Sequence, residues 1–270
     1  MDRYAVLGNP VAHSLSPAIH ARFGELTGDR IDYRALEAPL GGFAVFARAF
    51  FDSGARGANV TLPFKVDAYE LAEVRSERAQ AAGAANFLAM REGGIHADNT
   101  DGAGLVADLE SNLGCAIADG EILIVGAGGA SRGVIAPLLA RKPRRVVIAN
   151  RTEGKARELA RRFASRGSIV GAALEAIPES GYTIVINATS TSTKAEPLSL
   201  PARVFEGALA YDMAYGPSAD RFLSAAKSAG AARTSDGLGM LVEQAAESFA
   251  LWRDQRPPTS SVLAELRARR

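Results

Sequence analysis

Three glycines, at positions 126, 128 and 129, carry the clearest chemical signature in the sequence, within the segment EILIVGAGGASRG at residues 121–133. The uncharged run 122–125 predicts a buried strand, the glycines predict a turn, and the segment up to about residue 141 is compatible with a helix. Glycine lets a pyrophosphate approach the first amides of such a helix. We therefore expect a dinucleotide site formed by Gly126, Ala127, Gly128, Gly129 and Ala130, with Ser131 replacing the third glycine of the strict motif.

The residues after the next apolar run indicate which dinucleotide binds. Residues 145–149 (RVVIA) predict the second strand, which leads into Asn150, Arg151 and Thr152 about where the ribose-contacting residue belongs. An NAD site would carry an acidic residue there. Arg151 instead offers a guanidinium to a 2′-phosphate, with Thr152 as a hydroxyl donor and Lys155 as a second cation, so the sequence predicts NADP. The alternative is a glycine-rich helix cap followed by an unrelated exposed arginine.

Composition limits the other partners. The 270 residues suggest about two domains, and 47% hydrophobic content is ample for folded cores. Lys plus Arg number 31 and Asp plus Glu number 30, giving a net charge of +1, so we expect a small-molecule substrate and neither nucleic acid nor a membrane as partner. The three histidines are scattered and Cys115 is the single cysteine, so we expect no metal site. The start MDRYAVLGNP lacks the pattern of a secretion signal, and we expect a cytoplasmic protein.

The elements that position these residues divide into two halves. In the first half we expect strands at 3–7, 31–38, 57–61, 86–91 and 95–98, and helices from residue 16 and over 42–53, 74–82 and 103–113. Ser16 before Pro17 has the chemistry of a helix N-cap, whereas Ser14 does not. Thr100 or Asp101 could cap the helix that follows them. Lys65 lies at a strand-to-helix junction, where a lysine is often simply solvated.

From residue 121 the pattern alternates between strand and helix. Strands are expected at 145–149, 183–187 and 209–213, and helices at 153–165 and 219–229. This alternation predicts a doubly wound α/β sheet, with Thr189, Met213 and residues 235–237 above the crevice where the cofactor lies. A long helix at 238–252 and a last short helix follow.

Six stretches together resemble the shikimate dehydrogenase family. They are GNPVAHSLSP, GANVTLPFK, AGAANF, DNTDG, GAGGASRG with ANRT, and DGLGMLVEQAA, and the resemblance covers nearly the whole chain. It implies an N-terminal α/β substrate domain over 1–101, completed by helices in 238–270, a Rossmann-type NADP domain over 102–237, and a cleft between them. It also implies the reaction of 3-dehydroshikimate and NADPH to shikimate and NADP⁺.

The resemblance also implies site residues. Lys65 and Asp101 would be the catalytic pair. The substrate hydroxyls and carboxylate would be bound by Ser14, Ser16, Thr61, Asn86 and Gln244, and Tyr215 would line the same site. Asn150, Arg151, Thr152 and Lys155 would hold the adenosine end of NADP, while Met213 and Gly237 would border the nicotinamide. Such Ser, Thr, Asn and Gln side chains supply the donors and acceptors that a polyhydroxylated carboxylate requires, and ketone reduction needs a proton donor, which Lys65 can be.

Two loops depart from the family pattern. Residues 190–196 lack the usual glycine and methionine, and residues 215–221 lack the usual Thr-Pro, so we expect changed contacts on the nicotinamide side. A quinate or other cyclitol dehydrogenase is an alternative within the class, although Ser16, rather than a bulkier threonine, favours shikimate. A non-catalytic NADP-binding module is the alternative from another class, and it would not need both Lys65 and Asp101. The protein is expected to be a monomer or a homodimer.

Overall fold

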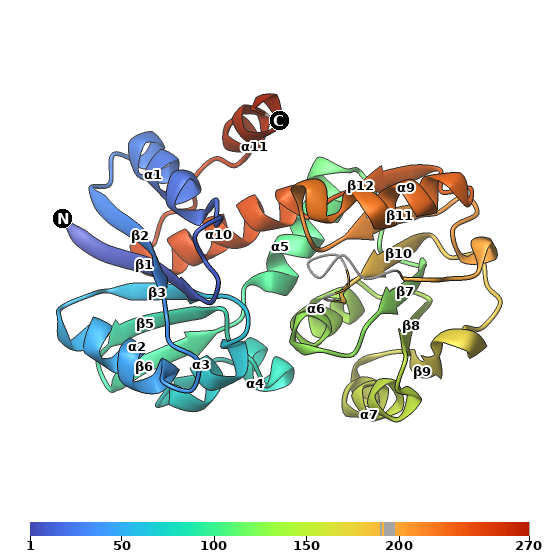
Figure 1. Cartoon of the computed structure of the whole chain (residues 1–270), viewed down its shortest axis with the longest axis horizontal. Coiled ribbons are helices and arrows are strands. Elements are labelled where there is room, and N and C mark those ends of the chain that lie inside the picture. The colour runs from blue at the N-terminus through green and yellow to red at the C-terminus, as the bar shows by residue number, and fades with distance from the viewer. Residues whose placement is uncertain (190, 192–197, 270) are drawn as a thin grey trace. The chain divides into compact units, whose positions relative to one another are not determined.

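The structure of the protein is a computed structural model that describes residues 1–189, 191 and 198–269. The chain divides into two compact units (Figure 1). Unit 1 comprises Met1–Gly104 and Leu241–Arg270, and unit 2 comprises Leu105–Met240. No helix among the described residues is long and apolar enough to cross a membrane.

Unit 1 is built on a mixed six-stranded sheet with the order β2-β1-β3-β5-β6-β4. Strands β1, β2 and β3 are parallel, β5 is antiparallel to β3 and β6, and β4 is parallel to β6. The strands are β1 (Asp2–Gly8), β2 (Ile31–Glu37), β3 (Gly57–Val60), β4 (Val74–Arg75), β5 (Phe87–Arg91) and β6 (Gly94–Asp98). The helices are α1 (Ser16–Thr27), α2 (Phe43–Asp52), α3 (Lys65–Leu71), α4 (Glu77–Ala82) and α11 (Ser260–Ala268), with parts of α5 (Asp101–Ala107) and α10 (Leu238–Arg253).

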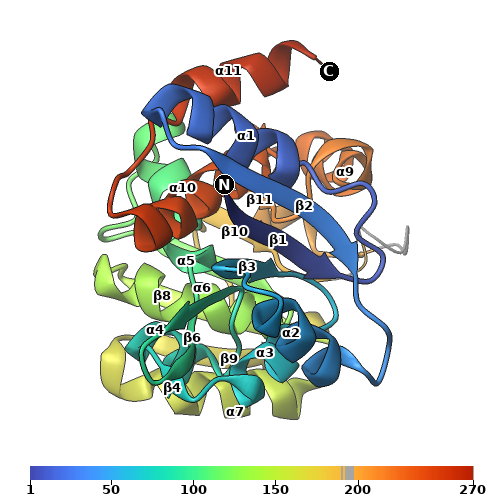
Figure 2. The same cartoon turned by 90° about the vertical axis from the view of Figure 1, so that its left-hand side faces the viewer.

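Alternation along β1 sets the two faces of this sheet. Tyr4 and Val6 pack in one cluster with Tyr33 and Trp252, whereas Ala5 and Leu7 belong to the opposite cluster, which holds the aromatic residues of α2. Helices α1 and α10 cover the first face and α2 and α3 the second (Figure 2). The unit is therefore a three-layer α/β structure, and its sheet is covered on both sides by chain segments far apart in sequence.

Unit 2 has a parallel sheet with the order β12-β11-β10-β7-β8-β9, which is the doubly wound dinucleotide-binding order with β7 as first strand. Its strands are β7 (Glu121–Val125), β8 (Arg145–Asn150), β9 (Ile169–Ala173), β10 (Ile184–Asn187), β11 (Leu209–Asp212) and β12 (Arg233–Ser235). Helix α9 (Asp220–Ser228) packs on one face, and α6 (Gly129–Ala140) and α7 (Glu153–Phe163) lie on the other (Figure 1). The expected α/β fold with a Rossmann-type sheet is confirmed.

Three local predictions differ from the structure. Residues 74–82 form the short strand β4 followed by α4, because the Ser76 hydroxyl caps α4 by accepting the Ala79 amide at 3.1 Å. The expected helix 103–113 begins earlier and ends in a π-helical turn over Asp108–Asn112. Strand β9 was not predicted, because its sequence IVGAA contains glycine and two alanines, which have low strand propensity.

Candidate active site

Lys65 and Asp101 form an ion pair in unit 1. Lys65 is the first residue of α3 and Asp101 the first of α5, and Lys65 Nζ lies 2.6 Å from Asp101 Oδ2. The two side chains are 18% and 6% exposed. The structure thus brings together the two residues expected to be catalytic, and it leaves the ammonium group partly accessible beside a buried carboxylate.

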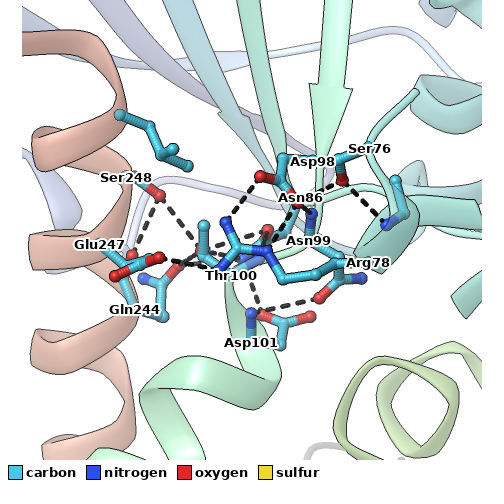
Figure 3. Close-up of polar contacts among 12 residues, drawn as sticks. Ser76, Arg78, Asn86, Asp98, Asn99, Thr100, Asp101, Gln244, Glu247 and Ser248 are labelled. Carbon is cyan, nitrogen blue, oxygen red and sulfur yellow. Dashed lines mark hydrogen bonds and ion pairs between the residues drawn. The ribbon is translucent and has the colours of Figure 1, made fainter. Parts of the chain in front are cut away.

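Asn86 connects this pair to helix α10. Its Nδ2 lies 2.9 Å from Thr100 Oγ1, 2.9 Å from Asp101 Oδ1 and 3.0 Å from Gln244 Oε1, while its Oδ1 accepts the Thr100 amide at 2.7 Å. An amide nitrogen has only two hydrogens for these three acceptors. The oxygens of Thr100, Asp101 and Gln244 therefore compete for these two hydrogens. Figure 3 shows Asn86, Thr100, Asp101 and Gln244 converging.

The segment before α5 has its own internal bonds. The Asp101 amide donates to Asn99 Oδ1 at 3.2 Å, so the residue that receives this amide is Asn99 rather than Thr100 or Asp101. The Thr100 hydroxyl instead contacts Asn86 and Ser248. The side chains of Thr100 and Asp101, either of which could cap α5, both contact Asn86.

The serines near the N-terminus are placed differently from the capping prediction. Helix α1 begins at Ser16 itself, and the Ser16 amide donates to Ser14 Oγ at 3.3 Å. Ser16 is buried, and the hydroxyl of Tyr33 donates to Asn59 Oδ1 at 2.8 Å. Burial raises the pKa of Tyr33 well above its ordinary value, so this hydroxyl stays protonated. The N-cap position of α1 is Leu15, and no side chain caps this helix, so the cap expected at Ser16 is wrong.

Thr61 and Tyr215 stand apart from this hydrogen-bonded cluster. Thr61 follows β3, is half-buried, and its amide donates to Leu7 O at 2.9 Å. Tyr215 belongs to unit 2, where it follows β11 and precedes a short 3-10 turn at Gly216–Ser218. The structure therefore places Thr61 in the same unit as Lys65, and Tyr215 in the other unit.

Two polar residues of the cluster, Asn59 and Ser248, were not singled out from the sequence. Asn59 donates to Asn86 O at 3.1 Å and to Ser248 Oγ at 2.9 Å, and Ser248 Oγ lies 3.2 Å from Thr100 Oγ1. Asn59 could have been found as the single polar side chain of the strand GANV. Ser248 could have been found four residues after Gln244, because residues with that spacing share a helix face.

The glycine turn of unit 2 has the shape expected of a dinucleotide site. Gly126 has φ of +112°, and a Cβ there would lie 3.0 Å from Ala188 O, whereas side-chain positions at Gly128 and Gly129 face open space. The Ser131 hydroxyl is buried and donates to Gly126 O at 2.8 Å. Serine therefore replaces the third glycine by satisfying the carbonyl of the first. Ala127 and Ala130 lie within this same turn and the start of α6.

The cations expected to choose the cofactor follow β8. Arg151, Thr152 and Lys155 are exposed, and the Asn150 side chain donates to Thr152 O at 3.0 Å. Within the described part of the chain Arg151 makes no hydrogen bond or ion pair. Because a guanidinium without an acidic partner is available to a phosphate, these residues fit NADP.

The ends of β10 and β11 complete this edge of the sheet. Thr189 Oγ1 lies 2.7 Å from Asn187 Oδ1, and Asn187 Nδ2 donates to Asp212 Oδ2 at 2.9 Å. A Cβ at Gly237 would overlap the carbonyl of Met213, so only glycine fits there. In the second atypical loop, the Gly216 amide donates to Asp236 Oδ2 at 2.9 Å. Most of the first atypical loop, 190–196, lies outside the described residues.

No group of three potential metal ligands occurs among the residues that the structure describes.

The sheet order of unit 2, its glycine turn and the lysine–carboxylate pair of unit 1 define a nicotinamide-dependent oxidoreductase of the α/β class. Residues 6–88 match the shikimate dehydrogenase substrate binding domain, residues 108–198 match shikimate/quinate 5-dehydrogenase, and residues 237–267 match the C-terminal domain of shikimate 5′-dehydrogenase. The chain belongs to the shikimate dehydrogenase family.

Individual relatives agree with this assignment. The NADP(+) shikimate dehydrogenase of Nitrosospira multiformis is 53% identical over 268 residues, which cover 99% of this chain and 98% of that protein. The crystal structure of the Ael1 enzyme from Pseudomonas putida has a TM-score of 0.92 at 46% identity, with 98% of each chain covered. Shikimate 5-dehydrogenase from Thermus thermophilus, crystallised with NADP(H) and shikimate, has a TM-score of 0.86 at 34% identity, with 99% of each chain covered.

Proposed function

We infer that the protein interconverts 3-dehydroshikimate and shikimate with NADP as cofactor. This proposal rests on the Lys65–Asp101 ion pair, which lies within a cluster of amide and hydroxyl side chains. The chain is also about half identical, over its whole length, to NADP-dependent shikimate dehydrogenases. The turnover of a polyhydroxylated carboxylate needs both parts of this arrangement. The cluster binds the oxygen atoms of the substrate, and the Lys65–Asp101 pair transfers a proton.

Unit 1 is proposed to bind the substrate. Lys65 donates the proton to the oxygen of the ketone as it becomes an alkoxide, and Asp101 holds the ammonium group in place through the 2.6 Å contact. Asn86 and Gln244 bind substrate oxygens once one of their mutual contacts is exchanged. Ser14, Ser16, Thr61 and Tyr215 supply further hydroxyl contacts. In the oxidation of shikimate the same groups act in reverse.

Unit 2 is proposed to bind NADP. Backbone amides between Gly126 and Ala130 contact the pyrophosphate, and Asn150, Arg151, Thr152 and Lys155 contact the adenosine end with its 2′-phosphate. Thr189, Met213 and Gly237 border the nicotinamide. When bound, NADP supplies or accepts the hydride.

The test is an absorbance assay of NADPH formation with shikimate as substrate. We expect turnover with shikimate and NADP⁺, and much slower turnover when NAD⁺ replaces NADP⁺. Quinate should be the poorer substrate in a parallel assay, since position 16 is serine rather than the bulkier threonine. Quinate turnover equal to that of shikimate would assign the broader cyclitol dehydrogenase activity instead, and binding of NADP without turnover would assign a non-catalytic module.

The single cysteine, Cys115, suits a reducing compartment, and we propose that the protein acts in the cytoplasm as a monomer or homodimer. Size-exclusion chromatography with light scattering distinguishes these two assembly states.

A further inference from the structure

Arg78 links the two segments of unit 1 that carry the expected active-site residues. It lies on α4, and its guanidinium forms a fork on Asp98, with Nε 3.0 Å from Oδ1 and Nη2 2.6 Å from Oδ2. Its third nitrogen, Nη1, lies 2.8 Å from Glu247 Oε1 on α10. One side chain therefore contacts both the end of β6 and the helix that carries Gln244 (Figure 3).

Asp98 is the starting point of the segment that ends in Asp101. Its carboxylate accepts hydrogen bonds from the Ser76 hydroxyl and, at 2.6 Å, from the Asn99 amide. The Asn99 side chain in turn donates to Ala84 O at 3.0 Å and accepts the Asp101 amide. Burial opposes the charged form of Asp98, but hydrogen bonds from Arg78 and Ser76 outweigh it and hold the pKa of this carboxyl below its ordinary value. The ionised Asp98 side chain therefore fixes the position of the backbone three residues before Asp101.

Glu247 is the residue of α10 that Arg78 contacts. It lies three residues after Gln244 and one before Ser248, and Arg256 contacts it from a second side at 2.9 Å. A residue three positions away occupies the neighbouring turn of the helix, so a shift at Glu247 is transmitted to Gln244 through rigid helical backbone. The side chains of Arg78, Asp98 and Glu247 are 33%, 12% and 24% exposed, which limits screening of their charges by solvent.

We propose that Arg78 is a positioning residue for the reaction, acting on Asp101 through Asp98 and on Gln244 through Glu247. This inference rests on the proposed function of the Lys65–Asp101 site. It goes beyond the binding and proton-transfer residues, because Arg78 contacts neither Lys65 nor Asp101 among the described interactions. The planar guanidinium places donors on three separate nitrogens, two of them in a fork on Asp98 and one toward Glu247, and an ammonium group with its single nitrogen cannot reproduce that geometry.

The contacts of Arg78 with Asp98 and with Glu247 predict separable effects on kcat and KM. Asp98→Asn disturbs the segment of Asp101 and should lower kcat with a smaller change in KM. Glu247→Gln disturbs the helix of Gln244 and should raise KM for shikimate with a smaller change in kcat. Arg78→Lys retains the positive charge, loses the fork, and should change both parameters, lowering kcat/KM by about 10- to 100-fold, as expected when reacting groups are misplaced by about 1 Å.

Arg75→Met is the matched control. Arg75 lies three residues before Arg78, donates to the carbonyls of Tyr69 and Glu70 at 2.7 and 3.0 Å, and packs over the Tyr69 ring, but it contacts neither Asp98 nor Glu247 in the described structure. Its loss should lower the melting temperature and leave kcat and KM near wild-type values. Kinetics of all variants are measured at a temperature where circular dichroism shows each to be folded.

The outcomes are distinct. Separation of kcat and KM effects between Asp98→Asn and Glu247→Gln, with both effects in Arg78→Lys, supports the positioning role. Wild-type kinetics in Arg78→Lys, or losses in every variant that follow only the fall in melting temperature, would overturn it. Wild-type protein without activity on shikimate, or Lys65→Ala with normal kcat, would instead overturn the proposed function or its catalytic assignment, and both are measured first.

Discussion

Among the single residues of unit 1, Asn59 and Asn86 each make more than one buried polar contact. Asn59 joins Tyr33, Asn86 and Ser248, while Asn86 joins the proposed catalytic pair to α10. Because an unsatisfied buried polar group is costly, such a cluster has few alternative arrangements. Its geometry is therefore set before a ligand arrives, which is the condition for efficient proton transfer at Lys65.

The first prediction concerns Lys65 and Asp101. If Lys65 donates the proton in the transition state, Lys65→Ala should lower kcat by about 10²- to 10⁴-fold with a much smaller change in KM. Asp101→Asn should cause a similar loss because it removes the carboxylate that holds the ammonium group. The double variant should be little worse than the poorer single variant, since the two act as a unit. Steady-state kinetics with shikimate and NADP⁺ measure all three.

Thr61→Val is the comparison for this pair. It removes a hydroxyl that would contact the substrate in ground and transition states alike, so it should act mainly on KM. A Lys65→Ala variant with normal kcat and raised KM would make the lysine a binding residue and would require another proton donor.

The second prediction concerns cofactor choice at Arg151. Removing a charge-assisted contact to phosphate should cost about 1.5 to 3 kcal/mol, or about ten- to a hundredfold in NADP⁺ affinity. Arg151→Ala should leave NAD⁺ affinity nearly unchanged, because NAD lacks the 2′-phosphate. Titration with both cofactors tests this, and an equal loss for NADP⁺ and NAD⁺ would contradict the assignment.

At the scale of elements, α10 begins against a buried carboxylate. A Cβ at Gly239 would overlap Asp108, whose Oδ2 accepts the Tyr211 hydroxyl at 2.6 Å. Burial, reinforced by Asp108, raises the pKa of Tyr211 well above its ordinary value, so the tyrosine remains a donor. The close approach of this helix to Asp108 therefore requires glycine.

The third prediction compares two glycines at the second position of a helix. Gly239 follows Leu238 at the start of α10, and Gly154 follows Glu153 at the start of α7, where a Cβ would meet open space. Gly154→Ala should raise the free energy of unfolding by about 0.5 to 1 kcal/mol through helix propensity. Gly239→Ala should lower it by about 1 to 3 kcal/mol through overpacking. Urea unfolding measures both, and equal stabilisation by the two changes would refute the steric argument.

At the scale of the whole molecule, the two units have separate hydrophobic cores, and unit 1 is completed by residues 241–270. The first sheet face of unit 1 holds His20, which stacks on Tyr33 with ring centroids 4.1 Å apart and is fully buried. Neither ring nitrogen has a hydrogen-bond partner by distance and angle in the described structure. Burial lowers the pKa of His20 to about 3, with the nearby Asn59 opposing the shift.

The fourth prediction is the acid sensitivity of unit 1. Because the folded-state pKa of His20 is lowered from 6.5 to about 3, the unfolded chain binds a proton below pH 6.5 that the folded chain does not bind. The free energy of unfolding should therefore fall by about 1.4 kcal/mol for each pH unit between about 6 and 4. His20→Phe keeps an aromatic ring on Tyr33 and should remove this slope.

The fluorescence of Trp252, the single tryptophan, reports this transition because its ring lies 5.5 Å from that of His20. The stabilising carboxylates Asp98 and Glu73 have lowered pKa values, so their contributions are lost at lower pH. An unchanged slope in His20→Phe would assign the acid sensitivity to other groups.

The doubly wound unit and the glycine turn could be predicted from the sequence alone, as could the residues after β8 that are proposed to select the cofactor. These features are local: an apolar run, a turn and a helix start lie within about 30 residues, and residues 150–155 follow directly from the next strand. The family motifs also indicated Lys65, Asp101, Asn86 and Gln244. The sequence missed β9, because small residues at a sheet edge carry a weak pattern.

Only the tertiary structure decided how the polar side chains of unit 1 are paired. Asn59 and Ser248 are 189 residues apart, Arg78 and Glu247 are 169 apart, and each pair meets because α10 returns to the first sheet. It also placed Leu15 at the N-cap of α1 and directed the amide of Asp101 to Asn99. Hydrogen bonds between distant segments depend on the distances and directions that packing creates, and no local pattern of residues encodes them.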